Sequence, residues 1–82
     1  MKKKSTRAKP FSLCVSKSLK RYLQDLNGES PAALYDMVIS QVEKPLLEII
    51  MERADQNQSK AAQMLGINRN TLRKKLRDHG LS

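Results

Sequence analysis

Apolar residues between Ser12 and Asn27 recur at spacings of three and four, which is the period of one face of a helix. The members of this stripe are Val15, Leu19, Tyr22, Leu23 and Leu26. Asn27 and Gly28 follow, and both residue types tolerate the left-handed backbone conformation that ends helices. The pattern predicts a first helix that stops at Asn27-Gly28.

The segment from Ala32 to about Ala54 is the most apolar in the chain and carries two neighbouring stripes. The first contains Leu34, Val38, Val42, Pro45 and Ile49, and the second contains Tyr35, Ile39, Leu46 and Ile50. One partner helix cannot cover both stripes, whereas a second copy of the same segment can. We therefore expect a dimer core made of Leu34, Val38, Val42, Pro45, Leu46, Ile49 and Ile50.

Three residues set the bounds and the shape expected of this second helix. Ser30 suits an N-cap, and Pro31 suits the first helical position, where its missing N–H costs nothing. Pro45 lies inside the pattern and removes one backbone hydrogen bond, so a kink near Gln41 is expected. Two shorter helices meeting at Glu43-Lys44 are the alternative, which the sequence leaves open.

Residues 57–77 have the spacing of a helix-turn-helix. Ser59 can cap a short helix whose inward face is Ala61, Ala62 and Leu65, and Ala62 is small where the two helices must approach each other. Gly66 supplies the positive φ of the turn, and Ile67 fills the core from the turn. Asn68 is expected to cap the second helix, which Leu72 and Leu76 anchor against the first.

The remaining positions of the second helix are polar and mostly cationic: Arg69, Asn70, Thr71, Arg73, Lys74, Lys75 and Arg77. Because a recognition helix presents its N-terminal residues to base edges, Arg69 and Arg73 are the candidates for contact with bases in the major groove. The candidates for phosphate contact are Asn68, Thr71, Lys74, Lys75 and Ser59, with Lys60 and Arg77 adding charge near the backbone. A merely solvated helix face is the alternative, and the apolar and glycine positions around it favour the DNA-binding interpretation.

Charge is distributed unevenly along the 82 residues, whose formal net charge is +8. Residues 1–28 carry eight cations and one anion, residues 29–56 carry two and six, and residues 57–82 carry six and one. Two basic ends around an acidic middle indicate a polyanionic partner, and nucleic acid is favoured over a membrane. Residues 1–10 lack apolar periodicity and are expected to be a disordered basic arm, either a solvated tail or a contact for phosphates.

The sequence lacks the usual features by which a chain this small is stabilised, inserted into a membrane or exported. One cysteine, Cys14, makes an internal disulfide impossible, and Cys14 with His79 falls short of a structural zinc site, so oligomerisation is the expected source of extra stability. The longest strongly apolar stretch, Leu46 to Met51, is interrupted by Glu48, and no apolar segment follows the N-terminal lysines. Because no segment is apolar enough to span a bilayer or to follow the lysines as in a signal peptide, we expect no membrane partner and no export. The single free thiol of Cys14 suits a reducing cytoplasm.

An enzymatic function is not expected from these residues, and no cofactor or metal is implied. There is no phosphate-binding glycine loop and no serine or cysteine paired with a usable base. The carboxylates of the second helix are interpreted as its solvated face: Asp36, Glu43, Glu48 and Glu52. RNA binding is a weaker alternative, because the chain has two Tyr, one Phe and no Trp with which to stack single-stranded bases.

The chain resembles the Fis family, the bacterial factors for inversion stimulation, over about residues 10 to 82. The resemblance rests on Leu26-Asn27-Gly28, Leu34-Tyr35, Val42-Glu43-Lys44-Pro45-Leu46-Leu47, Gly66-Ile67-Asn68-Arg69, Thr71-Leu72-Arg73-Lys74-Lys75-Leu76 and Gly80. It implies an all-α protomer of four helices in an intertwined homodimer, with a dimerisation core at residues 11–56 and the helix-turn-helix at residues 57–82. It also implies a nucleoid-associated protein that bends DNA at degenerate sites and regulates transcription, with possible contact to the transcription machinery.

On the matching positions, the resemblance implies DNA contacts by a defined set of residues. These are Asn68, Arg69, Thr71, Arg73, Lys74 and Lys75, supported by Asn57, Ser59 and Lys60. The chain departs from better-known members in having no counterpart of their N-terminal β-hairpin, so contact with a DNA invertase is not expected. Asp78 stands where the family tends toward a cation, and His79 is expected to be a solvated residue at the helix end.

A detached DNA-binding domain of an NtrC-type activator is the alternative, because such domains share the pattern from Ala61 to Leu72. The chain begins with its own Met1 and has no ATPase segment. A complete small protein is therefore the expectation.

Overall fold

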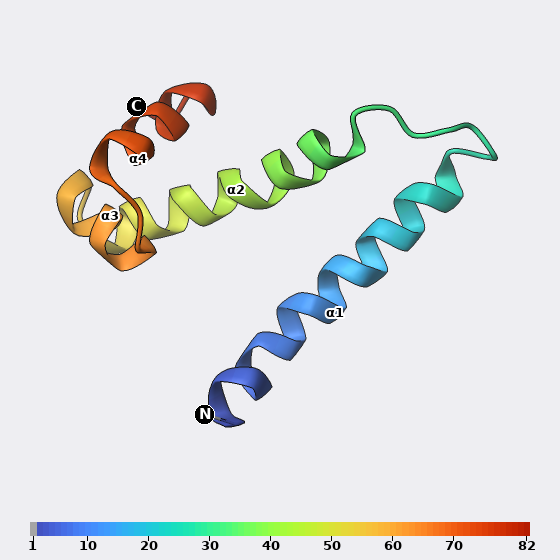
Figure 1. Cartoon of the computed structure of the whole chain (residues 1–82), viewed down its shortest axis with the longest axis horizontal. Coiled ribbons are helices and arrows are strands. Elements are labelled where there is room, and N and C mark those ends of the chain that lie inside the picture. Colours follow the sequence, from blue (N-terminus) through green and yellow to red (C-terminus); the bar gives the residue numbers. More distant parts are fainter. Residues whose placement is uncertain (1) are drawn as a thin grey trace. The chain divides into compact units, whose positions relative to one another are not determined.

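A computed structural model describes the backbone of residues 2–82 and the side chains of residues 10–82. Within that range the chain is all-α, as predicted, with four helices and no strand (Figure 1). It divides into two compact units, one up to Ala32 and one from Ala33 to Ser82, and each is described by itself. The helices are α1 (Lys2–Asp25), α2 (Leu34–Arg53), α3 (Gln58–Leu65) and α4 (Arg69–Asp78).

The first unit consists of α1 and the segment after it. The structure differs from the expected disordered arm, because α1 already begins at Lys2 and includes Pro10. Lysine, arginine and alanine lose little conformational freedom in a helix, so a basic composition is compatible with one. The predicted stop is confirmed: α1 ends at Asp25, and both Asn27 (φ 53°) and Gly28 (φ 86°) are left-handed.

The second helix, α2, runs without interruption through Pro45, so the alternative of two shorter helices is wrong. The predicted start at Ser30-Pro31 is also wrong. The N-cap is Ala33, which has the left-handed values φ 51° and ψ 39° and makes no side-chain capping bond. This left-handed residue interrupts the helical conformation, and α2 therefore begins only at Leu34. The kink near Gln41 stays a prediction.

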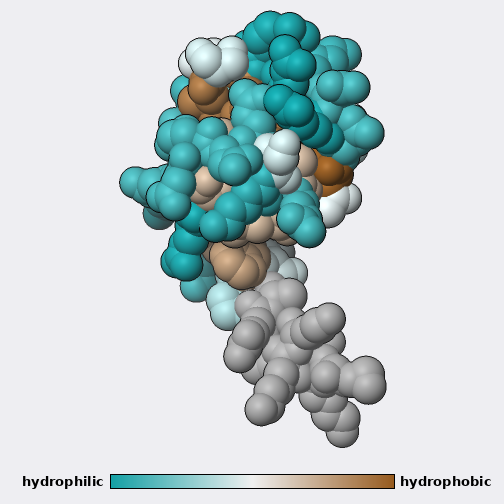
Figure 2. Space-filling view, turned by 90° about the vertical axis from the view of Figure 1, so that its left-hand side faces the viewer, coloured by the Kyte–Doolittle hydropathy of each residue, from teal (hydrophilic) through white to brown (hydrophobic). Residues whose placement is uncertain are grey.

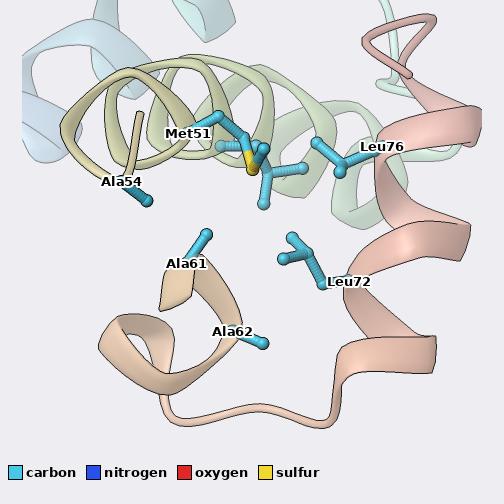
Figure 3. Close-up of a cluster of buried hydrophobic side chains, with 7 residues drawn as sticks. Met51, Ala54, Ala61, Ala62, Leu72 and Leu76 are labelled. Atoms are coloured by element: carbon cyan, nitrogen blue, oxygen red, sulfur yellow. The ribbon is translucent and has the colours of Figure 1, made fainter. Parts of the chain in front are cut away.

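The core of the second unit joins α2, α3 and α4 (Figure 3). It is formed by Leu47, Met51 and Ala54 of α2, Ala61 and Ala62 of α3, and Leu72 and Leu76 of α4. The α2 members lie four and three residues apart, so they share one helical face. Partly buried Ile50, Leu65, Ile67 and Leu81 pack against them.

This core confirms the inward positions predicted for the helix-turn-helix and adds a contribution from α2 that was not predicted. Ala61 and Leu72 are fully buried, and Ala62 and Leu76 nearly so. Ile50, which the sequence assigns to the dimer core, is partly buried and packs against this core. The C-terminal end of α2 has apolar residues on more than two faces. Because α3 and α4 cover the face of Leu47 and Met51, Ile50 beside that face also contacts the core.

None of the helices among the described residues is long and apolar enough to cross a membrane.

Candidate nucleic-acid interface

The first helix of the helix-turn-helix, α3, starts from a side-chain cap. Asn57 is extended (φ −88°, ψ 106°), and its Oδ1 accepts a hydrogen bond of 3.1 Å from the backbone N–H of Lys60. Ser59, predicted as the cap, lies instead in the first turn and is exposed. An amide oxygen on the extended residue before the helix satisfies an N–H group that the helix itself leaves unpaired, so Asn57 takes that role.

The turn between α3 and α4 depends on glycine. Gly66 is left-handed (φ 74°, ψ 29°), and the N–H of Ile67 donates to the carbonyl oxygen of Ala62 at 3.0 Å, as in a Schellman motif. A Cβ at Gly66 would meet nothing within 4 Å. The positive φ, and not lack of space, is therefore what favours glycine here.

The recognition helix α4 begins at the predicted cap. Asn68 is extended (φ −69°, ψ 143°), and its Oδ1 accepts a 2.7 Å hydrogen bond from the backbone N–H of Asn70. Leu72 and Leu76 are buried against α2 and α3. The cap fixes the start of α4, and the two leucines fix which side of it faces the core.

The opposite side of α4 is exposed and cationic. Six of the seven positions predicted to face outward are exposed: Arg69, Asn70, Thr71, Arg73, Lys74 and Arg77. Figure 2 views the molecule from the side of α3 and α4, and most of the surface on that side is hydrophilic. Asn57, Ser59 and Lys60, at the start of α3, are exposed as well. The described residues thus place the predicted DNA-contacting side chains on accessible surface, with Lys75 as the exception.

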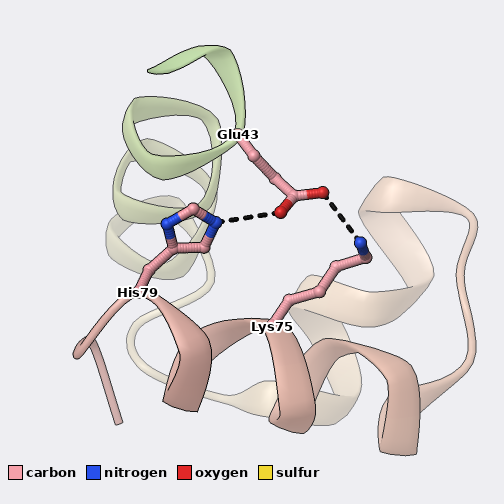
Figure 4. A network of polar contacts seen from close by, with 3 residues as sticks. All are labelled: Glu43, Lys75 and His79. Carbon is pink, nitrogen blue, oxygen red and sulfur yellow. Dashed lines mark hydrogen bonds and ion pairs between the residues drawn. The ribbon is translucent and has the colours of Figure 1, made fainter. Parts of the chain in front are cut away.

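Lys75 points toward α2 and is held there by Glu43 (Figure 4). Its Nζ donates to Glu43 Oε2 at 2.8 Å, and the Lys75 side chain is 37% exposed. The other oxygen, Glu43 Oε1, lies 2.9 Å from Nε2 of His79, whose side chain is only 9% exposed. Since an ionised carboxylate only accepts hydrogen bonds, His79 Nε2 carries the proton in this contact.

Two expectations are corrected by this cluster. Glu43 is not simply part of a solvated face, and His79 is not a solvated helix-end residue. The hydrogen bond from Lys75, followed by that from His79, lowers the pKa of Glu43 below its ordinary value. The same hydrogen bond to Glu43 raises the pKa of Lys75. Both shifts favour the charged forms, so the pair is ionised at neutral pH.

The sequence contained a signal for this cluster. Glu43 lies four residues before Leu47, on the face of α2 that packs against the helix-turn-helix, and Lys75 and His79 lie three residues after Leu72 and Leu76. A periodic reading of the buried face would have included all three polar residues. No group of three or more His, Cys, Asp or Glu in the part of the chain that the structure describes could hold a metal ion.

Comparison with known proteins decides the family. The family model described as "Bacterial regulatory protein, Fis family" matches residues 38–79, which include most of α2, all of α3 and all of α4. The chain is also 60% identical over 71 residues to a protein of Neisseria meningitidis described as a Fis-like DNA-binding protein, covering 87% of this chain and 90% of that one. The chain belongs to the Fis family.

Two further relatives show how the likeness to Fis proteins extends. A Fis-like DNA-binding protein of Ralstonia nicotianae is 58% identical over 88% of this chain and 94% of its own length. DNA-binding protein Fis of Mannheimia haemolytica is 51% identical over 89% of this chain and 74% of its own length. These matches cover 87–89% of the chain and so extend well beyond the helix-turn-helix, which favours a Fis-like protein over an NtrC-type domain.

Proposed function

We propose that this Fis-family chain binds double-stranded DNA as a homodimer and places α4 of each protomer in a major groove. The observation that carries the proposal is the exposed cationic side of α4, fixed in orientation by the buried residues Leu72 and Leu76. A helix of about this length fits the major groove, and guanidinium groups on its first turns can reach base edges. The proposed function is one of binding, without catalysis.

The proposed contacts fall into two groups. Arg69 and Arg73 read base edges, since both are exposed and both lie in the first two turns of α4. The remaining contacts go to the phosphate backbone, and they are made by Asn57, Ser59, Lys60, Asn68, Thr71, Lys74 and Arg77. Lys75 differs from this group because its ammonium is already paired with Glu43.

The proposed dimer uses the apolar residues of α2 that its own chain leaves exposed. Five of them are 39–77% exposed in the single chain: Tyr35, Ile39, Val42, Leu46 and Ile49. Apolar surface of this extent on one helix is typical of an interaction site. The proposed dimer core further includes Leu34, Val38 and Pro45 beside Val42, Leu46 and Ile49, with Ile50 shared with the helix-turn-helix core.

The proposed role in the cell follows from family membership. We propose a cytoplasmic protein of the bacterial nucleoid that bends DNA and regulates transcription, including by contact with the transcription machinery. The resemblance to Fis implies two recognition helices held closer than one turn of straight B-DNA, and a duplex would have to bend to meet both. Preference among sites would then depend on the flexibility of the DNA as well as on base contacts.

The direct test of the proposal is the substitution Arg69→Ala. Removing one guanidinium that reads a base should cost about 1–3 kcal/mol of binding free energy and relax the preference at one base pair. Lys44→Ala is the control, because Lys44 is an exposed cation of α2 and is not part of the recognition helix. Fluorescence anisotropy with a duplex selected by the wild-type protein measures both. Equal affinity of wild type and Arg69→Ala would contradict the proposed interface.

A further inference from the structure

One carboxylate connects the dimerisation helix to the recognition helix. Glu43 of α2 uses Oε2 for Lys75 Nζ at 2.8 Å and Oε1 for His79 Nε2 at 2.9 Å. Lys75 and His79 are one helical turn apart at the C-terminal end of α4, so both donors approach from the same side (Figure 4). The three side chains form a bridge between α2 and α4, in which Glu43 lies 32 and 36 positions before its two partners in the sequence.

This bridge adds what the apolar core does not provide. Burial of Leu72 and Leu76 sets which side of α4 faces the core, but apolar contacts are not directional and set the rotation of the helix only coarsely. Hydrogen bonds depend on distance and angle, so two of them to one carboxylate restrict the rotation of α4 about its own axis. Rotation about that axis determines which side chains face a groove.

We propose that Glu43 is a positioning residue for DNA recognition, which acts through Lys75 and His79 to fix the orientation of α4. Lys75 accordingly serves as a tie to α2 and not as a phosphate contact, although it lies in the cationic run of the recognition helix. Its charge is balanced inside the protein by Glu43. This inference rests on the proposed function, because it describes how the same DNA-binding helix is held.

The salt dependence of binding separates a tie from a phosphate contact. Each phosphate neutralised by a lysine contributes about −0.9 to the slope of log affinity against log salt. Lys74→Met removes an exposed cation and should make the slope shallower by about 0.9 for each lost contact, or about 1.8 for a symmetric dimer. Lys75→Met is the matched variant, and its slope should equal that of wild type.

The second measurement is discrimination between sequences. Affinity is measured for a duplex selected by the wild-type protein and for the same duplex with its sequence scrambled. Lys75→Met and Glu43→Gln should each reduce the ratio of the two affinities by about three- to tenfold, as expected for residues that act without touching the ligand. Glu48→Gln is the control for Glu43→Gln, because Glu48 is an exposed carboxylate of the same helix, and it should leave the ratio unchanged.

The outcomes distinguish failure of this inference from failure of the proposed function. If Lys75→Met flattens the salt slope as much as Lys74→Met, Lys75 contacts phosphate and the inference is overturned. If Glu43→Gln keeps the wild-type ratio, Glu43 does not position α4. If wild type itself binds neither duplex, the proposed function fails. Lys75 is partly exposed, so Lys75→Met tests the slope even where Glu43→Gln unfolds the chain.

Discussion

The two ends of α2 have opposite relations to the rest of the chain. Near its C-terminal end, Leu47 and Met51 are 1% and 8% exposed, because α3 and α4 of the same chain cover them. Toward the other end, Tyr35 is 77% and Val42 is 47% exposed. The helix-turn-helix thus obtains its core within one chain, whereas the apolar residues of α2 that α3 and α4 leave exposed, which include Leu46 and Ile49, are the surface that we propose a second copy covers.

The largest expected effect concerns the self-contained end. Leu72→Ala removes a fully buried side chain from the core and should lower the free energy of unfolding by about 2–5 kcal/mol. Met64→Ala is the control, since Met64 is 48% exposed on α3 and its loss should change that free energy by less than about 0.5 kcal/mol. Urea unfolding followed by circular dichroism measures both. Similar effects of the two changes would show that α3 and α4 do not pack as described.

A substitution in the exposed apolar surface of α2 should weaken dimerisation. Val42→Asp places a carboxylate in the proposed dimer core and should weaken dimerisation by about 1–3 kcal/mol, which is about five- to 150-fold in the dissociation constant. Gln41→Asp adds the same charge at the preceding position, which lies outside both apolar stripes, and should leave the dimer intact. Sedimentation equilibrium at micromolar concentration provides the measurement. A wild-type protein that sediments as a stable folded monomer would refute the proposed dimer.

A substitution in the segment between α2 and α3 should have a smaller effect on stability. Gln56 is left-handed (φ 64°), which costs an L-residue about 1–2 kcal/mol, whereas glycine adopts this conformation at an entropic cost of about 0.5–1 kcal/mol. Gln56→Gly should therefore stabilise the folded chain by about 0.5–1 kcal/mol. Gln58→Gly, in the first turn of α3, should destabilise it by a similar amount. Thermal unfolding of both variants tests the expected opposite signs.

The smallest effect is the pH dependence of the bridge between α2 and α4. Because the folded protein lowers the pKa of Glu43, the carboxylate stabilises the fold at pH values above its unfolded pKa of about 4.3. That contribution, about 0.5 kcal/mol or less for a partly exposed pair, is lost as the pH falls through the lowered pKa. The raised pKa of Lys75 places the corresponding loss on the alkaline side, above about 10.4.

Glu43→Gln isolates the acid limb of this dependence. The variant should be less stable than wild type at pH 7, and the difference should shrink as the pH falls below about 4.3, the unfolded pKa, toward the lowered pKa of folded Glu43. Urea titrations across this range measure the difference. A constant gap between variant and wild type down to pH 3 would contradict a role for the ionised carboxylate.

Local patterns predicted the elements whose cause lies in nearby sequence. The stop at Asn27-Gly28, the turn at Gly66, the cap at Asn68 and the inward leucines of α4 follow from residue type and spacing. The start predicted for α2 was wrong. Both Ser30-Pro31 and Ala33 can precede a helix, and no sequence pattern indicates a left-handed alanine. The cap of α3 was likewise mispredicted, because Asn57 and Ser59 are both capping residue types, and Asn57 takes the role predicted for Ser59.

Tertiary contacts account for the rest of what the sequence did not predict. Apolar residues lie on several faces of α2. Periodicity alone therefore could not identify Leu47 and Met51 as the residues that face the helix-turn-helix. Glu43 resembles any solvated carboxylate until α4 brings Lys75 and His79 to it. Charged residues are usually solvated, so the helical period that places Glu43, Lys75 and His79 on buried faces becomes a usable signal only once packing shows which faces these are.

The most direct measurement is a nuclear magnetic resonance titration of the labelled protein with a duplex of selected sequence. We expect the backbone amide signals of the exposed α4 positions Arg69, Arg73 and Lys74 to shift together with those at the start of α3. Buried Leu47 and the exposed α2 residue Lys44 should shift least. Unchanged α4 signals at saturating duplex would contradict the claim that this helix is the surface that meets DNA.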